Sequence, residues 1–181
     1  MRAPPIPADR LTLEQKTVCD EIFRITGRSI TGPFAPLLPA PHVAAAAVQM
    51  FDAFRSKRKL EERLFEFFIL VIARQWSSQF EWHTHEQRAI DAGLAAETAA
   101  DVRDGRVPAT MREDERMVYD VTTELQQSRS LSEGSFNRAL EILKDRELVV
   151  ELIAGIGFYT MVAIVLNSFD VPIPAGKTPL R

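Results

Sequence analysis

Four residues between positions 66 and 85 have side chains suited to proton chemistry. Glu66 is the single carboxylate in the otherwise apolar run of residues 64–73. Further along, Ser78, Glu81 and His85 recur at intervals of three and four. On a helix this spacing places all three on one face, where Glu81 and His85 can touch. Histidine exchanges protons near neutral pH, and a carboxylate can orient it or act as a second acid. The pattern therefore predicts an acid–base centre.

A helix break at Ser77 and Ser78 would allow the Glu66 helix to turn back beside the His85 helix, so that the two side chains meet. Glu66 needs such a partner, because an unpaired buried carboxylate is unfavourable unless it is protonated. The same pair could equally do no more than satisfy two polar groups in a core. A metal bound by Glu66, Glu81 and His85 is conceivable on ligand type. The paired HExxH and Glu-x-x-His spacings are missing, however, so we predict no metal and no other cofactor.

Other residues near this group are candidates for substrate binding. Arg74 is a candidate cationic clamp on position alone. Trp76 and Trp82 either anchor the core or provide a substrate platform. Tyr159 and Asn167 are polar interruptions of the last apolar helix and could reach the same pocket.

The elements that position these residues are predicted to be helices. Thr12 and Gln15 form a capping-box pattern before the first helix, and Gly93 suits the position after a helix end. Further segments have helical periodicity, and none alternates with period two for long enough to require a strand. We predict an all-α, single-domain bundle of about seven or eight helices. It comprises an extended arm over residues 1–11, a helical domain over 12–170 and an extended tail over 171–181.

Composition narrows the functional classes. A chain of 181 residues with 46% hydrophobic residues can bury one sizeable core. The net charge of −3 and the pI near 5.7 give no electrostatic footprint for nucleic acid. The apolar segment of residues 149–169 is interrupted by polar residues and glycines, which favours a buried helix over a membrane span. The N-terminus lacks the apolar core of a signal peptide. We therefore expect a cytoplasmic protein without nucleic-acid or membrane partners.

The pattern of Glu66 followed by Ser78-x-x-Glu81-x-x-x-His85 resembles the core motif of the carboxymuconolactone decarboxylase and alkylhydroperoxidase D superfamily. In the peroxidase branch the motif is a glutamate followed by Cys-x-x-Cys-x-x-x-His at the same separations, so Ser78 and Glu81 stand where the two cysteines would be. The flanking sequence segments FILVIARQW, FEW and AGL also resemble those of the decarboxylase-type domain of this superfamily. The resemblance implies an alkylhydroperoxidase D-like helical fold and a homo-oligomer (dimer, trimer or hexamer), with the site near subunit contacts.

The missing cysteines decide which chemistry the resemblance favours. Peroxide reduction needs a thiolate and a resolving thiol, and the single cysteine, Cys19, lies far from the motif. The decarboxylase branch uses acid–base groups without redox thiols or a cofactor. We therefore expect a cofactor-independent acid–base enzyme resembling carboxymuconolactone decarboxylase, acting on a small carboxylated lactone or a related enolisable acid. In this hypothesis His85 delivers a proton to carbon after CO₂ loss, Glu66 orients it, Glu81 is a second carboxylate and Ser78 binds the substrate.

Two alternatives stay open at this point. One is another enzyme on the same fold: a peroxidase-like oxidoreductase of alkylhydroperoxidase or peroxiredoxin type, or a lactone hydrolase. The other is a non-catalytic oligomeric binding protein.

Overall fold

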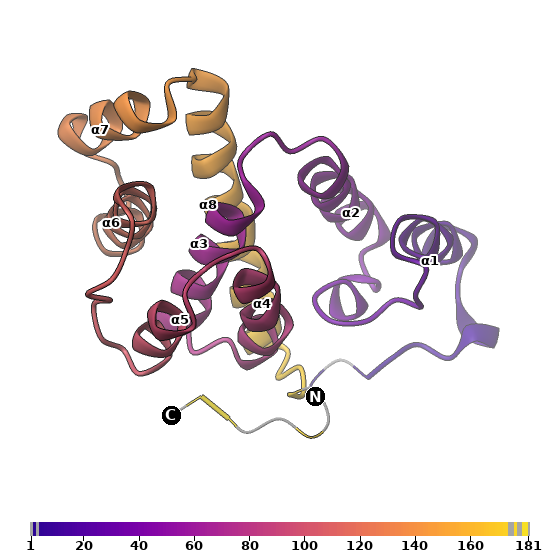
Figure 1. The fold of residues 1–181 in the computed structure, drawn as a ribbon. Helices are drawn as coiled ribbons and strands as arrows, with labels where there is room; N and C mark the ends of the chain where they lie inside the picture. Colours follow the sequence, from indigo (N-terminus) through magenta and orange to yellow (C-terminus); the bar gives the residue numbers. More distant parts are fainter. Residues whose placement is uncertain (1, 3, 174–175, 177–178, 181) are drawn as a thin grey trace. The chain divides into compact units, whose positions relative to one another are not determined.

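The structure is a computed structural model that describes residues 2, 4–173, 176 and 179–180. This part of the chain forms eight α-helices and two short 3-10 turns and contains no strand, so the predicted all-α class is confirmed (Figure 1). The helices are α1 Leu13–Thr26, α2 Pro41–Ser56, α3 Glu62–Gln75, α4 Gln79–Asp91, α5 Ala96–Arg103, α6 Glu113–Ser128, α7 Glu133–Leu143 and α8 Arg146–Ser168. The turns are η1 Ala8–Arg10 and η2 Ala35–Leu37. Residues 1 and 3 of the predicted arm and 174, 175, 177, 178 and 181 of the predicted tail lie outside the described residues.

The contacts within the chain divide it into two compact units. The N-terminal unit comprises Met1–Arg58 and Ile164–Pro172, and the central unit comprises Lys59–Ala163 and Ile173–Arg181. The boundary falls inside α8, which is a different division from the predicted arm, helical domain and tail. All four motif residues belong to the central unit.

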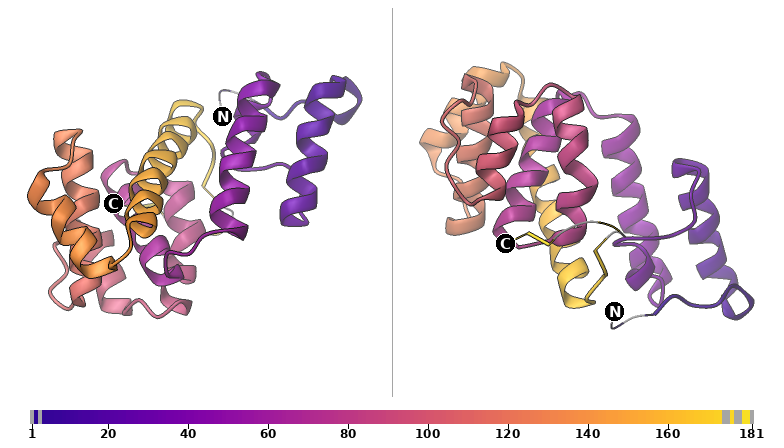
Figure 2. Two further views of the ribbon diagram at one scale, coloured as in Figure 1. Left: turned by 90° about the horizontal axis from the view of Figure 1, so that it is seen from above. Right: turned by 60° about the horizontal axis from the view of Figure 1, so that its bottom comes forward.

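In the N-terminal unit, α1 begins with the predicted capping box. The Oγ1 of Thr12 accepts the backbone N–H of Gln15, whose side chain accepts the N–H of Thr12 in return. The helix ends at Gly27, whose φ of 68° suits a residue without a Cβ. α1 lies beside α2 (Figures 1 and 2). Leu13 and Phe23 are 81% and 60% exposed, so α1 buries fewer apolar side chains than the apolar pattern of its sequence suggests.

In the central unit, α3 is the buried helix, with every residue from Arg63 to Ala73 enclosed. Helices α4, α5 and α6 pack against it (Figures 1 and 2). α8 contributes Tyr159, whose ring meets those of Phe65 and Phe68 edge-on at centroid distances of 5.5 and 6.0 Å. It also contributes Gly155, where an added Cβ would lie 2.8 Å from the Phe68 ring. The apolar run is thus helical and buried on all sides, as its composition predicts.

A buried ion cluster fastens the first turn of α3 to the first turn of α6. The guanidinium of Arg63, a residue only 3% exposed, lies 2.6 Å from both Glu115 and Asp114 and 3.1 Å from Glu61. Glu115 also accepts the backbone N–H of Arg112 at 2.8 Å. Burial raises the pKa of Asp114, but the hydrogen bond and charge of Arg63 outweigh it and hold that pKa below its ordinary value. Each buried charge in this cluster therefore has a partner.

A tight turn joins α3 to α4. Trp76 caps the end of α3, Ser77 has a left-handed φ of 49°, and Ser78 occupies the N-cap position of α4. The backbone N–H of Ser78 donates to the carbonyl of Ala73 at 2.7 Å. The break therefore falls where the two serines predict it, although the Ser78 side chain makes no capping hydrogen bond. The turn places α4 alongside α3.

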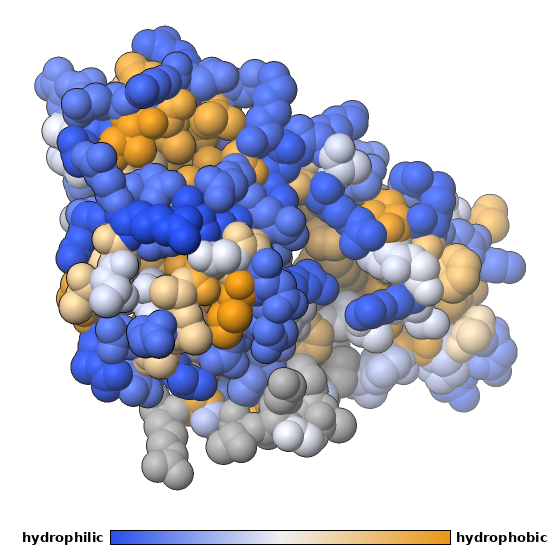
Figure 3. All heavy atoms as spheres, viewed as in Figure 1, coloured by the Kyte–Doolittle hydropathy of each residue, from blue (hydrophilic) through white to orange (hydrophobic). Residues whose placement is uncertain are grey.

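Among the described helices, α8 is the one long and apolar enough to cross a membrane by length and composition, and 44% of its most apolar window is buried. Its Glu151 accepts the backbone N–H groups of Lys59 and Leu60 at 2.8–3.1 Å. These hydrogen bonds and the contact of Gly155 on Phe68 join α8 to other segments of the central unit. Figure 3 also shows an apolar surface patch over α7 and the first turns of α8. Val150 of α8 is 59% exposed.

Candidate active site

Glu66 and His85 form a direct, buried pair. Glu66 faces α4 from the second turn of α3, and Nδ1 of His85 lies 2.6 Å from its Oε2. The two residues are 5% and 6% exposed. The turn at Ser77 and Ser78 thus brings Glu66 and His85 together, as the predicted helix break implies. The bond engages Nδ1 and leaves Nε2 as the ring nitrogen that can exchange a proton with another molecule.

Glu81 is the second carboxylate of this centre, one helical turn before His85. It is 3% exposed. Burial raises its pKa to about 7. The positive charge of His85 opposes this rise, the Glu66 carboxylate adds to it, and the charge of Arg88 opposes it. At neutral pH Glu81 is therefore divided between its acid and carboxylate forms, which is the condition that general acid–base catalysis favours.

The aromatic ring of Tyr159 closes one side of the centre. It meets the His85 imidazole edge-on, with the centroids 5.6 Å apart and the planes at 88°. Tyr159 is thus brought to the predicted site. Asn167 is exposed and lies in the part of α8 that groups with the N-terminal unit, outside the central unit that holds His85.

Hydrogen-bonding groups that the protein leaves unused are concentrated around the start of α4. Within the described residues, five buried side-chain atoms have no hydrogen-bond partner: Arg74 Nε, Ser78 Oγ, Glu81 Oε2, Trp82 Nε1 and His83 Nε2. A buried polar group without a partner costs about 1–3 kcal/mol. All five belong to residues 74–83, and four of them, on Arg74, Ser78, Glu81 and Trp82, are on predicted site residues. This concentration distinguishes the region from the fully paired cluster around Arg63.

Arg74 in the last turn of α3 and Trp76 at its C-cap have surroundings that spacing did not anticipate. The guanidinium of Arg74 lies against Gly105, whose Cβ, if present, would be 3.1 Å from an Arg74 nitrogen. Trp76 is 38% exposed, and its indole N–H donates to Gln126 on α6 at 2.7 Å. Arg88 is the arginine whose charge acts on Glu81, and its effect is smaller than that of His85. Its position, seven residues after Glu81 on the same helix face, was the available signal.

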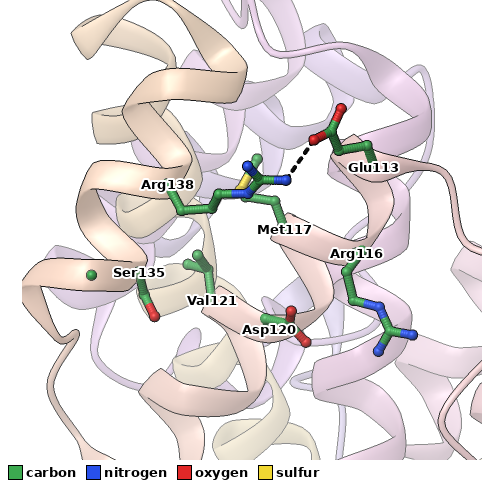
Figure 4. Close-up of a pocket in the computed structure, with 8 residues that line it drawn as sticks. Glu113, Arg116, Met117, Asp120, Val121, Ser135 and Arg138 are labelled. Atoms are coloured by element: carbon green, nitrogen blue, oxygen red, sulfur yellow. Dashed lines mark hydrogen bonds and ion pairs between the residues drawn. The ribbon is translucent and has the colours of Figure 1, made fainter.

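Two surface clefts lie outside this centre. One, of about 160 Å³, lies between α6 and α7 (Figure 4). Arg138 reaches across it to Glu113, whereas Arg116 is directed away. The other, of about 320 Å³, lies in the N-terminal unit and includes Cys19. Burial and the neighbouring Asp20 raise the pKa of the Cys19 thiol, which is the opposite of what a reactive thiolate requires.

No three histidine, cysteine, aspartate or glutamate side chains among the described residues are grouped so as to hold a metal ion.

The comparisons with known proteins identify the fold. No protein-family model and no curated protein matches the sequence. Among solved structures, the chain is similar to an uncharacterized peroxidase-related protein from Ralstonia eutropha JMP134, described as an alkylhydroperoxidase AhpD core. That match has 16% identity and a TM-score of 0.77, covering 98% of this chain and 97% of the other. It is also similar to an uncharacterized peroxidase-related protein from Silicibacter sp. TM1040, with 14% identity and a TM-score of 0.72, covering 96% and 92%.

At sequence identities of 16% and 14%, the similarity to these two structures shows the fold alone. The chain has the alkylhydroperoxidase AhpD-like helical fold, and the fold expected from the motif of Glu66, Ser78, Glu81 and His85 is confirmed. The cysteine-free decarboxylase-type branch stays a prediction, as do the roles of the four residues.

Proposed function

We propose that the centre formed by Glu66, Glu81 and His85 is the active site of a cofactor-independent acid–base enzyme. The reaction resembles that of carboxymuconolactone decarboxylase, with a small carboxylated lactone or a related enolisable acid as substrate. The observation that carries the proposal is the 2.6 Å bond between His85 and Glu66 beside a second carboxylate whose pKa is about 7.

His85 is the proton donor in this proposal. Loss of CO₂ breaks a carbon–carbon bond, and the electron pair moves into the adjacent carbonyl to give an enolate. The enolate carbon then takes a proton from Nε2 of His85. Glu66 fixes the ring through Nδ1 and stabilises its protonated form. Tyr159 restricts the tilt of the ring by its edge-on contact.

Glu81 complements His85 because its acid form persists at neutral pH. As an acid it can return the proton that His85 has delivered, and as a carboxylate it can accept one from solvent. Arg74, whose Nε is buried without a partner within the described residues, and Arg88, whose charge acts on Glu81, are the candidates for holding the substrate carboxylate.

The proposal is tested by replacing His85. Candidate carboxylated lactones and enolisable acids are incubated in D₂O, with CO₂ release and deuterium incorporation at carbon as readouts. We expect His85→Ala to lower turnover by about 10²–10⁴-fold. His42→Ala, which alters an exposed histidine of α2, is the matched control and should retain activity. Full turnover in His85→Ala would rule out the assignment.

A peroxidase-like oxidoreductase is the second candidate, because both solved neighbours carry the description peroxidase-related. A dithiol cycle needs two cysteines and this sequence has one. Peroxide consumption that disappears in Cys19→Ser would favour this candidate, whereas lactone opening without CO₂ release would favour a hydrolase.

A non-catalytic binding protein is the third candidate, favoured by the low exposure of Glu66 and His85. It predicts that neither CO₂ release nor deuterium incorporation occurs with any substrate, while the pair contributes only to stability.

Self-association and a cytoplasmic location belong to the same proposal. The exposed apolar side chains Val150 and Met161 of α8, 59% and 37% exposed, offer surface for contact between copies in a dimer, trimer or hexamer. Light scattering on Val150→Glu and Met161→Glu tests this, since a buried charge at such a contact should dissociate the assembly.

A further inference from the structure

The buried face of α4 contains more polar groups than proton transfer needs. Ser78, Glu81, Trp82 and His85 follow one another at helical spacing, and all four are buried. Ser78 and Trp82 are 0% exposed, and neither Ser78 Oγ nor Trp82 Nε1 has a partner within the described residues. They lie one helical turn apart, so their side chains are neighbours on this face.

Both of these groups can donate a hydrogen bond. The indole N–H can only donate, and the serine hydroxyl has a proton to donate. Trp76, the other tryptophan, shows the usual arrangement, because its N–H donates to Gln126. A tryptophan that served only as a core anchor would be expected to satisfy its N–H in the same way. Trp82 therefore differs from a packing residue in this respect.

We propose that Ser78 and Trp82 form a two-donor site that binds a carbonyl oxygen of the ligand and stabilises it as it becomes an enolate. This inference rests on the proposed function, since it assigns the recognition of the substrate oxygen to the same helix face. It restricts the ligand class to compounds with a carbonyl oxygen conjugated to the carbon that loses CO₂.

The step balances without a further reactant. The bond to the carboxylate carbon breaks and CO₂ leaves, and its electron pair moves to the carbonyl oxygen held by Ser78 and Trp82. The proton from His85 then adds to carbon and the carbonyl is restored. Donors aimed at an oxygen where charge develops are worth more in a buried site than in water.

The test uses phenol, whose oxygen and ring imitate a conjugated enolate. The chain has two tryptophans, so a ¹⁵N–¹H spectrum contains two indole cross-peaks, which Trp76→Phe and Trp82→Phe assign. We expect added phenol to shift the Trp82 peak and to leave the Trp76 peak in place.

Variants then measure the contribution of each donor. Trp82→Phe and Ser78→Ala should each weaken phenol binding by about tenfold, whereas Trp76→Phe and Ser77→Gly should not change it. A stationary Trp82 peak, undiminished affinity in Trp82→Phe and Ser78→Ala, or no phenol binding by the folded protein would each overturn the proposal. Because the readout is binding, it is separate from the turnover test of His85. Donors that bind phenol in a protein without acid–base activity would uphold the oxygen site and refute the proposed reaction.

Discussion

The first and second turns of α3 each bury charged side chains, but the charges are fully paired in the first turn and incompletely paired at the second. At Arg63 one guanidinium meets three carboxylates, with contacts of 2.6 Å to Glu115 and Asp114. At Glu66 one bond of 2.6 Å holds His85, while Glu81 remains beside it with an unpartnered oxygen. The buried charges around Arg63 thus all have partners of opposite charge, whereas one turn later a buried carboxylate oxygen of Glu81 has none.

The difference shows how burial can serve two purposes. A paired buried charge orients two helices and makes its own removal costly, but it has no capacity left for another molecule. An incompletely paired group reduces stability and keeps that capacity. We therefore propose that the Arg63 cluster maintains the fold and that the Glu81 region serves function, and the following variants test this division.

The largest effect is expected from Arg63→Met. This change leaves Glu115, which is 2% exposed, without its cation, and we expect it to lower the free energy of unfolding by about 3–5 kcal/mol. Urea denaturation measures it. Adding Glu115→Gln should recover part of the loss, because the second change removes the uncompensated charge. If Arg63→Met alone were as stable as the parent protein, the Arg63 cluster would not maintain the fold, and the proposed difference between the two regions would be wrong.

Glu81→Gln should change stability in the opposite direction. The pKa of Glu81 rises from 4.5 to about 7 on folding, so its ionisation opposes the folded state. The parent protein should therefore lose stability as the pH rises from about 4.5 to 7 and reach a plateau above that. At pH 8 the variant should be more stable by about 3 kcal/mol, and at pH 4 the two should be alike. Glu97→Gln, at an exposed position of α5, is the control. Parallel pH profiles for Glu81→Gln and the parent would contradict the expectation.

Gly155→Ala tests how firmly α8 holds the middle of α3. The new methyl group would meet the buried Phe68 ring at 2.8 Å, and we expect a loss of about 1–3 kcal/mol. Gly157→Ala on the same helix has open space around it and should instead gain up to about 1 kcal/mol from helix propensity. Thermal unfolding of the pair isolates the contact, and equal effects would show that α8 does not press on Phe68.

The smallest change in stability is expected from Glu66→Gln. The amide keeps the size of the side chain and can still hydrogen-bond to His85, so the loss should be about 1 kcal/mol or less. Turnover should fall far more than stability, because the amide cannot stabilise a protonated imidazole. A loss in urea denaturation as large as that of Arg63→Met would place Glu66 among the residues that maintain the fold.

The features predicted correctly from the sequence depend on local signals. The capping box at Thr12, the helix end before Gly93 and the break at Ser77 follow from residues next to one another in the chain. The meeting of Glu66 and His85 also follows from local information, since one turn separates their helices. The all-α fold could be predicted because caps, glycines and apolar periodicity mark its helices in the sequence.

What escaped prediction depends on contacts between distant segments. Arg63 and Glu115 are 52 positions apart, and no periodic pattern links them. The direction of Arg74 toward Gly105 and the exposure of Phe23 likewise depend on which neighbouring elements cover a given helix face. The unpaired hydrogen-bond donors of Ser78 and Trp82 could not be predicted either. A residue type does not reveal whether its hydrogen bond is made, because that depends on the neighbouring segments.

The complete burial of α3 also has a consequence for the chain before it folds. Residues 67–73, FFILVIA, contain no charge, proline or glycine, and in an unfolded or newly synthesised chain they would be an aggregation-prone segment. The charged residues Arg63, Glu66 and Arg74 flank this segment on both sides. In the nascent chain the same side chains that later form the ion cluster and the candidate site act as gatekeepers against self-association. Neutralising them therefore affects solubility during expression as well as the folded protein.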